Sequence, residues 1–205
     1  KDLYLTVNKG DKIAFISRDS VALTHFFEIL AGNLKADTGE ITFGTTITTA
    51  YLPNDNHHYF EAKLSLIDWL RQYALTDEER EEVYLRTFLG RMLFTGEEAM
   101  KMAFVLSGGE KVRCMLSKMM LAKANLLLMD EPTNHLDIKS KEVLKEALKN
   151  YEGTFIVVSH DREFLDGLTN RIWDIEDKTL KIHHFGVKEF LARKMSLRNN
   201  GGVKL

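Results

Sequence analysis

The chain has 205 residues, a length that suits one globular domain or one domain with an inserted lobe. Hydrophobic residues make up 44% and charged residues 28% of it, and the formal net charge of −2 gives no overall nucleic-acid signature. Its one cysteine, Cys114, excludes an intrachain disulfide and fits a reducing cytoplasm, and no apolar run approaches the length of a membrane span.

The first part of the chain has the composition of short strands and turns. Lys1 has no Met before it, and no signal peptide precedes the strand-like alternation at residues 3–7. We therefore expect a piece of a longer protein. The elements predicted here are strands at 3–7, 12–17, 40–43 and 46–52, and a helix at 24–31 that follows a loop at 18–23.

The pattern becomes helical from residue 61 to about 123, with almost no strand signal. Thr76 followed by Glu79 predicts a capping box that opens a helix running to residue 87. Further helices are predicted at 89–94, 97–104 and 110–122. This stretch therefore predicts a helical lobe inserted between the first strands and the rest of the sheet.

Beyond this lobe, strands and helices alternate as they do in α/β proteins with a parallel sheet. The predicted strands are 126–129, 154–159, 171–175 and 180–184, and the predicted helices are 138–150, 161–168 and 187–195. The continuous apolar run at 126–129 is typical of a strand buried on both faces. We expect residues 1–205 to form a single domain whose tail, 196–205, is disordered.

Two acids follow the buried strand directly. Asp130 and Glu131 should therefore lie at the carboxyl edge of the sheet, where open α/β folds bind ligands. Asp130 could hold Mg²⁺ together with phosphate oxygens. Glu131 could polarise a water molecule for attack on a phosphate. The alternative is a strand followed by an acidic turn.

Two glycines occupy the first turn of the helix predicted at 110–122. Ser107 and Glu110 have the spacing of a capping box, which is one interpretation. Gly108 and Gly109 each weaken a helix, but they let an anion approach the amides at its positive end. This second interpretation predicts a phosphate-binding turn.

A histidine follows the next buried strand. His160 would lie in the same sheet edge as Asp130 and Glu131, where it could reach a terminal phosphate. The alternative, which His160 taken alone favours, is a surface histidine at the start of the next helix.

Together these segments resemble the ATP-binding cassette (ABC) ATPases in order and spacing. Residues 106–110 are similar to the signature motif, 126–131 to the Walker B strand, 134–137 to the D-loop ending at Asp137, and His160 to the switch histidine. The amino-acid sequence at 130–137 and 159–164 resembles the ABC-F branch, whose members carry two cassettes in one chain. Residues 89–94 and 186–194 are similar to the second cassette of that branch.

The resemblance implies an α/β fold of the P-loop NTPase class. It would have a mostly parallel core sheet, an antiparallel β lobe at the start and an inserted helical lobe. It implies ATP and Mg²⁺ as cofactors, with Glu131 and His160 as catalytic residues and with Asp130 and Thr24 as metal ligands. In cassette pairs the signature of one cassette closes over ATP held by the other. The resemblance therefore implies that Ser107, Gly108, Gly109 and Glu110 contact the ATP of the partner cassette.

The phosphate loop departs from the family pattern. The pattern G-x-x-x-x-G-K-[ST] falls on residues 17–24, where Ser17 and Ala22 replace its glycines and Leu23 replaces its lysine. Thr24, the expected magnesium ligand, remains, whereas Asp19 adds a charge of the wrong sign. The glutamine expected after the strand 46–52 is Asn54. We therefore predict that this loop does not bind ATP in the usual way.

The leading hypothesis from the resemblance is the second cassette of a cytoplasmic ATPase of the ABC-F type. Its partners would be a second cassette and the ribosome or tRNA, with no membrane partner. One rival is the ATP-binding subunit of a membrane transporter, which shares the core motifs. The other is a cassette without ATPase activity that acts as a docking scaffold.

Overall fold

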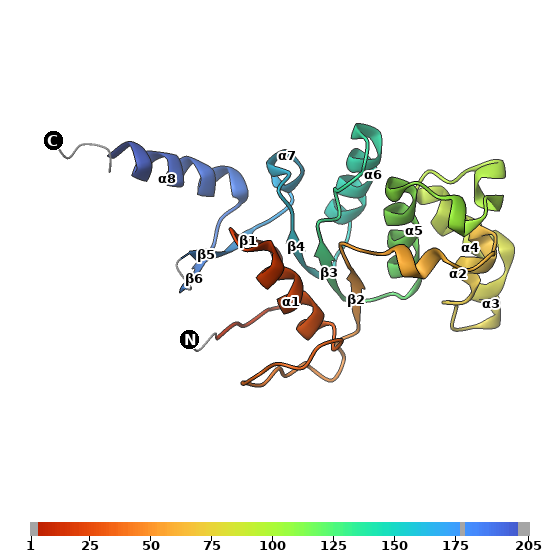
Figure 1. Cartoon of the computed structure of the whole chain (residues 1–205), viewed down its shortest axis with the longest axis horizontal. Coiled ribbons are helices and arrows are strands. Elements are labelled where there is room, and N and C mark those ends of the chain that lie inside the picture. The colour runs from red at the N-terminus through yellow and green to blue at the C-terminus, as the bar shows by residue number, and fades with distance from the viewer. Residues whose placement is uncertain (1–3, 177–178, 201–205) are drawn as a thin grey trace.

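A six-stranded sheet organises the structure, a computed structural model that describes residues 4–176 and 179–200 (Figure 1). The strand order is β2-β3-β4-β1-β5-β6, and every neighbouring pair is parallel except β5 and β6. The predicted α/β class with a mostly parallel sheet is therefore confirmed. The strands are β1 (Lys12–Ser17), β2 (Thr49–Leu52), β3 (Leu126–Asp130), β4 (Thr154–Val158), β5 (Arg171–Glu176) and β6 (Thr179–His183).

The helices lie on both sides of this sheet and in a group beside it. Figure 1 shows α1 on one side of the strands, α6 and α7 on the other, and α2 to α5 gathered beyond the edge strand β2. The helices are α1 (Ser20–Leu30), α2 (Leu66–Arg71), α3 (Asp77–Arg80), α4 (Glu82–Arg91), α5 (Gly108–Leu121), α6 (Ile138–Lys149), α7 (Arg162–Leu165) and α8 (Val187–Asn200). Single 3₁₀ turns occur at His57–Phe60, Gly96–Met100 and Ala103–Val105. The stretch predicted as a helical lobe thus holds α2 to α5.

The central strands are buried on both faces, as the apolar run at 126–129 predicted. All five residues of β3 and of β4 are buried. Side chains alternate between two core layers, so that Leu128 packs with Leu23 and Phe27 of α1 whereas Met129 joins the layer under α5 and α6. This double burial fixes the register that brings the carboxyl ends of β1, β3 and β4 to one edge.

The predicted N-terminal antiparallel lobe is not found within residues 4–176 and 179–200. Residues 4–7 and 40–43 form no strand, although both segments were predicted to be strands, and residue 3 lies outside the described residues. Tyr4, Ile41 and Phe43 are exposed, at 85%, 42% and 42%. A strand needs a hydrogen-bonded neighbour and a face to cover, and neither segment finds one among the described residues.

Three helix boundaries also differ from the sequence prediction. Helix α1 begins at Ser20 instead of residue 24, because Asp19 caps it. The helix predicted at 76–87 is broken at Glu81, whose ψ of 137° is extended. The closing helix continues to Asn200, so the predicted disorder of 196–205 is wrong for 196–200, and 201–205 lie outside the described residues. Among the described residues, no helix is long and apolar enough to span a membrane.

Candidate functional site

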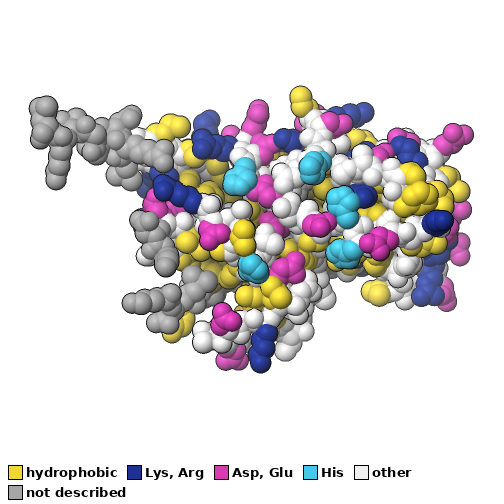
Figure 2. Space-filling model, in the orientation of Figure 1, with side chains coloured by type: hydrophobic (Ala, Val, Ile, Leu, Met, Phe, Trp, Pro, Cys, Tyr) yellow, Lys and Arg dark blue, Asp and Glu magenta, His cyan; other side chains and the backbone are white. Residues whose placement is uncertain are grey.

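Two adjacent strands deliver the acids and the histidine to one edge of the sheet. Asp130 ends β3, and the Glu131 backbone N–H donates to the Val158 carbonyl at the end of β4 at 2.9 Å. Both carboxyl side chains are buried, with residue exposures of 2% for Asp130 and 8% for Glu131. Figure 2 shows acidic and histidine side chains spread across the middle of the face viewed. The predicted convergence of the candidate catalytic groups is thus what the fold produces.

Asp130 meets α1 through Thr24. The Thr24 hydroxyl donates to Asp130 Oδ2 at 2.7 Å. Burial raises the pKa of Asp130, the Thr24 hydrogen bond opposes this, and the nearby Glu28 carboxylate raises it further. Glu28 lies one helical turn after Thr24 and accepts a hydrogen bond from the Tyr51 hydroxyl at 3.0 Å. Glu28 was missed in the sequence, where its i+4 spacing from Thr24 was the available signal.

Glu131 and His160 form a pair. Glu131 Oε1 lies 3.3 Å from His160 Nε2, and its Oε2 accepts the His160 backbone N–H at 3.3 Å. Burial raises the pKa of Glu131, and the neighbouring imidazole opposes that shift. Glu131 adopts φ +52°, a left-handed conformation that costs a non-glycine residue free energy. A carboxyl with a raised pKa beside an imidazole suits proton transfer.

The oxygen atoms beside Asp130 suit Mg²⁺ only in part. The Asp130 carboxylate and the Thr24 hydroxyl are hard oxygen donors of the kind that Mg²⁺ prefers. Within residues 4–176 and 179–200, no group of three or more His, Cys, Asp or Glu side chains is placed to hold a metal. The protein residues therefore fit a magnesium ion that takes its other ligands from phosphate and water.

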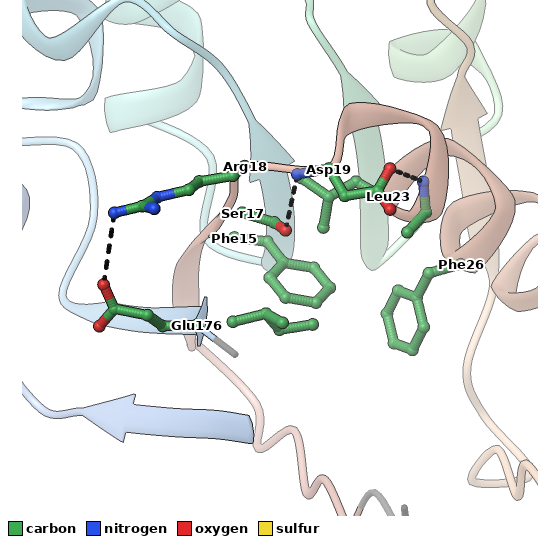
Figure 3. A pocket seen from close by; sticks show the side chains of 9 residues that line it. Phe15, Ser17, Arg18, Asp19, Leu23, Phe26 and Glu176 are labelled. Carbon is green, nitrogen blue, oxygen red and sulfur yellow. Dashed lines mark hydrogen bonds and ion pairs between the residues drawn. The ribbon is translucent and has the colours of Figure 1, made fainter. Parts of the chain in front are cut away.

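The segment expected to be the phosphate loop folds as the start of a helix. The Asp19 side chain accepts the Ala22 N–H at 3.0 Å, and the Asp19 N–H donates to Ser17 Oγ at 3.1 Å (Figure 3). Asp19 thus places its own carboxylate at the positive end of α1, where a phosphate would otherwise bind. Leu23 is 3% exposed and packs in the core with Phe27.

A cavity of about 390 Å³ lies beside this helix start (Figure 3). Its polar rim carries Arg18 and Glu176, whose charged groups approach to 3.7 Å, and Asp19. Its apolar wall is formed by Phe15, Leu23, Phe26 and Ile175. Residues 17–24 thus form a capped helix start beside this cavity, and their failure as an ordinary phosphate loop stays a prediction.

The turn at residues 107–110 has the capping box that its sequence allowed, and phosphate binding there stays a prediction. Ser107 and Glu110 form a complete capping box: the Ser107 N–H donates to Glu110 Oε2 at 2.9 Å, and the Glu110 N–H donates to Ser107 Oγ at 3.3 Å. Burial raises the pKa of Glu110, but the Lys101 ammonium, 2.8 Å from Glu110 Oε1, and the hydrogen bonds with Ser107 together hold that pKa below its usual value. Gly108 and Gly109 open α5 without side chains. Their contacts with the segment 134–137 were not predictable from the sequence.

Asn54 and the D-loop complete the site. The Asn134 side-chain amide donates to Asn54 Oδ1 at 3.1 Å. Asp137 caps α6 by accepting the Ser140 N–H at 2.7 Å, and this hydrogen bond lowers the pKa of Asp137. A second cavity, of about 290 Å³, joins part of this site: Asn54, Gly108, Asp130, Glu131, Asn134 and His135 line it, whereas Thr24 and His160 are not among its lining residues.

Comparison with known proteins relates this site to one family. The family model described as ABC transporter matches residues 1–134. The chain is 49% identical over 186 residues to the uncharacterized ABC transporter ATP-binding protein YkpA of Bacillus subtilis (strain 168), covering 90% of this chain and 34% of that protein. It is 31% identical over 199 residues to the ABC transporter F family member 5 of Arabidopsis thaliana, covering 97% of this chain and 28% of that protein.

A solved structure is similar in fold. The dimeric structure of a bacterial ABC transporter cassette matches with a TM-score of 0.73 at 17% identity, covering 90% of this chain and 89% of that one. The chain spans about a third of the length of the curated relatives that it matches.

Proposed function

Because this chain belongs to the ABC transporter family of ATP-binding domains, we propose that it is the second cassette of an ABC-F-type ATPase whose ATP turnover occurs at a site shared with a partner cassette. The similarity to an F family member over 97% of the chain supports the branch. The dimeric cassette of similar fold supports pairing of two such domains.

One contrast within the chain carries this proposal. The start of α1 is closed by its own residue Asp19, with Leu23 buried in the core. The turn at Ser107 has a complete capping box, and its two glycines put no side chain beside the first amides of α5. In a cassette of this kind, Asp19 occupies the place of the phosphate at α1 and the signature turn has no side chain in the way. Such a cassette is suited to complete the ATP site of its partner instead of binding ATP at its own.

Each residue then has a definite role in the full-length protein that holds both cassettes (the paired protein). Ser107, Gly108 and Gly109 present a hydroxyl and backbone amides to the terminal phosphate of ATP held by the partner cassette. Glu110 fixes that turn through its hydrogen bonds to Ser107. ATP bound with Mg²⁺ supplies the phosphoryl group, and Asp130 and Thr24 are the oxygen donors that would hold the metal in this chain's own site.

The whole protein, in this proposal, is cytoplasmic and acts on translation at the ribosome. Two rivals stand against it. The ATP-binding subunit of a membrane transporter would have the same core and would be recovered with membranes. A docking scaffold would keep the fold and bind its partner equally well with or without nucleotide.

The deciding experiment compares two substitutions in the paired protein, using steady-state phosphate release. Ser107→Arg puts a long side chain where the partner's phosphate must approach, so we expect it to remove most turnover. Glu131→Gln keeps the shape and removes only the ability to activate water, in a site already closed by Asp19, so we expect a much smaller loss. If Glu131→Gln halts turnover as completely as Ser107→Arg, this cassette hydrolyses ATP itself and the asymmetric arrangement is wrong.

A further inference from the structure

The two signature glycines pack against the D-loop of the same chain. A Cβ atom built on Gly109 would lie 2.7 Å from the His135 carbonyl oxygen, a separation that real Cβ atoms essentially never show. A Cβ on Gly108 would lie 3.2 Å from His135 Cβ and 3.3 Å from its Cγ. The His135 backbone therefore leaves no room for a side chain at Gly109, and a side chain at Gly108 would force His135 to move by a few tenths of an ångström, independently of any phosphate.

His135 belongs to a turn that is fixed at several points. It adopts φ +63°, in the left-handed region. The Asn134 N–H donates to the Glu131 carbonyl at 3.1 Å, and the Thr133 and Ser159 hydroxyls lie 2.8 Å apart in a buried contact. Asp137 then caps α6. The turn is thus held from β3, from the end of β4 and from α6, and its shape is set by the segment that also carries Glu131.

We propose that His135 is a positioning residue: it seats Gly108 and Gly109 against the turn after β3 and so sets where the signature amides point toward the partner's ATP. This inference rests on the proposed function for the identity of the ligand. It also gives Glu131 a place in this turn, because its carbonyl accepts the Asn134 N–H and its carboxylate accepts the His160 backbone N–H.

The contact is tested first in the 205-residue chain, by a double-mutant cycle read from melting temperatures. Gly108→Ala should lower the melting temperature by about 2–4 °C, because the new methyl group meets the His135 side chain. Adding His135→Gly should remove most of that drop, since glycine lacks the Cβ at 3.2 Å and accepts φ +63° without strain. His135→Ala keeps the Cβ and should rescue less. Gly109→Ala meets a backbone oxygen, so neither change at position 135 should rescue it.

The positioning role is tested next in the paired protein, by ATP turnover. Gly108→Ala should lower kcat about tenfold with the KM for ATP little changed, because the partner's phosphate loop still binds ATP and only the signature is displaced. The double variant with His135→Gly should recover to within about twofold of His135→Gly alone.

The outcomes separate this inference from the proposed function. If Gly108→Ala lowered the melting temperature equally in the wild-type chain and in the His135→Gly chain, the contact would be overturned. A rescued melting temperature without rescued kcat would overturn the positioning role, since Gly108 would then be needed by phosphate alone. If Ser107→Arg left the ATP turnover of the paired protein unchanged, the proposed function would fail. The melting temperatures would still measure the contact between Gly108 and His135.

Discussion

Asp130 shows how a site residue can oppose folding. It is 2% exposed, Thr24 donates a hydrogen bond to it, and burial together with Glu28 raises its pKa. A group whose folded-state pKa is raised contributes stability that is fully present below its unfolded pKa. That contribution is lost as the pH rises through the folded pKa. At neutral pH the charged Asp130 therefore lowers the free energy of unfolding.

Replacing this carboxylate should stabilise the chain. Asp130→Asn still offers an oxygen to Thr24 but carries no charge, so we expect a higher urea midpoint than wild type at pH 7. The gap should shrink as the pH falls toward about 4, where the unfolded-state carboxyl of wild type becomes protonated. Glu142→Gln, at an exposed site on α6, serves as the control and should show no such trend. A wild type more stable than Asp130→Asn at pH 7 would contradict the burial argument.

Some residue-scale features were predictable from the sequence and others were not. The Glu131–His160 pair followed from placing polar residues at strand ends, because parallel strands bring those ends together. The place of Thr24 beside Asp130 followed from the family resemblance. The contact between Gly109 and His135 was not predictable, since it depends on how α5 packs beside the turn after β3. Sequence pattern reveals which edge a residue joins, but not which backbone atom it touches.

Helix α1 is where local sequence and family pattern disagree. The family pattern places a loop at 18–23, but Asp19 is a favourable N-cap and the helix begins at Ser20. The extra turn rotates Leu23 into the core beside Phe27. The two predicted N-terminal strands fail for a different reason: their alternation is real, but pairing is non-local and no partner lies among the described residues.

This element makes a prediction about repair of the phosphate loop. Leu23→Lys restores the family's lysine in sequence, yet it places an ammonium group in an apolar core, so we expect a loss of about 3 kcal/mol or more in unfolding free energy. It should also bring no gain in Mg-ATP binding by titration calorimetry, because Asp19 still occupies the helix end. Leu23→Met, of similar volume, should cost under about 1.5 kcal/mol. A stable Leu23→Lys that binds ATP would show that position 23 faces the ligand.

At the scale of the whole molecule, the charge of the closing helix bears on whether this chain alone binds RNA. Residues 188, 193, 194 and 198 of α8 are basic, a pattern that indicates either an RNA contact or a solvated helix face. Among them, Lys194 lies 3.0 Å from Asp174, and Arg193 lies 2.5 Å from Glu189. Two of these cations are thus compensated within the chain, and the net charge is −2. Phosphate backbones bind proteins mainly through uncompensated cations.

We therefore expect ribosome association to require the paired protein. The 205-residue chain alone should stay in the supernatant of a sucrose cushion loaded with ribosomes at physiological salt. The full-length protein should pellet with ribosomes, and more so with a slowly hydrolysed ATP analogue, because the nucleotide holds the two cassettes closed. Ser107→Arg should remove the nucleotide-dependent part, since the signature can no longer close on the partner's ATP.

Recovery of the full-length protein with membranes and not with ribosomes would favour the transporter subunit. If the pelleted fraction changed neither with nucleotide nor with Ser107→Arg, the docking scaffold would be favoured.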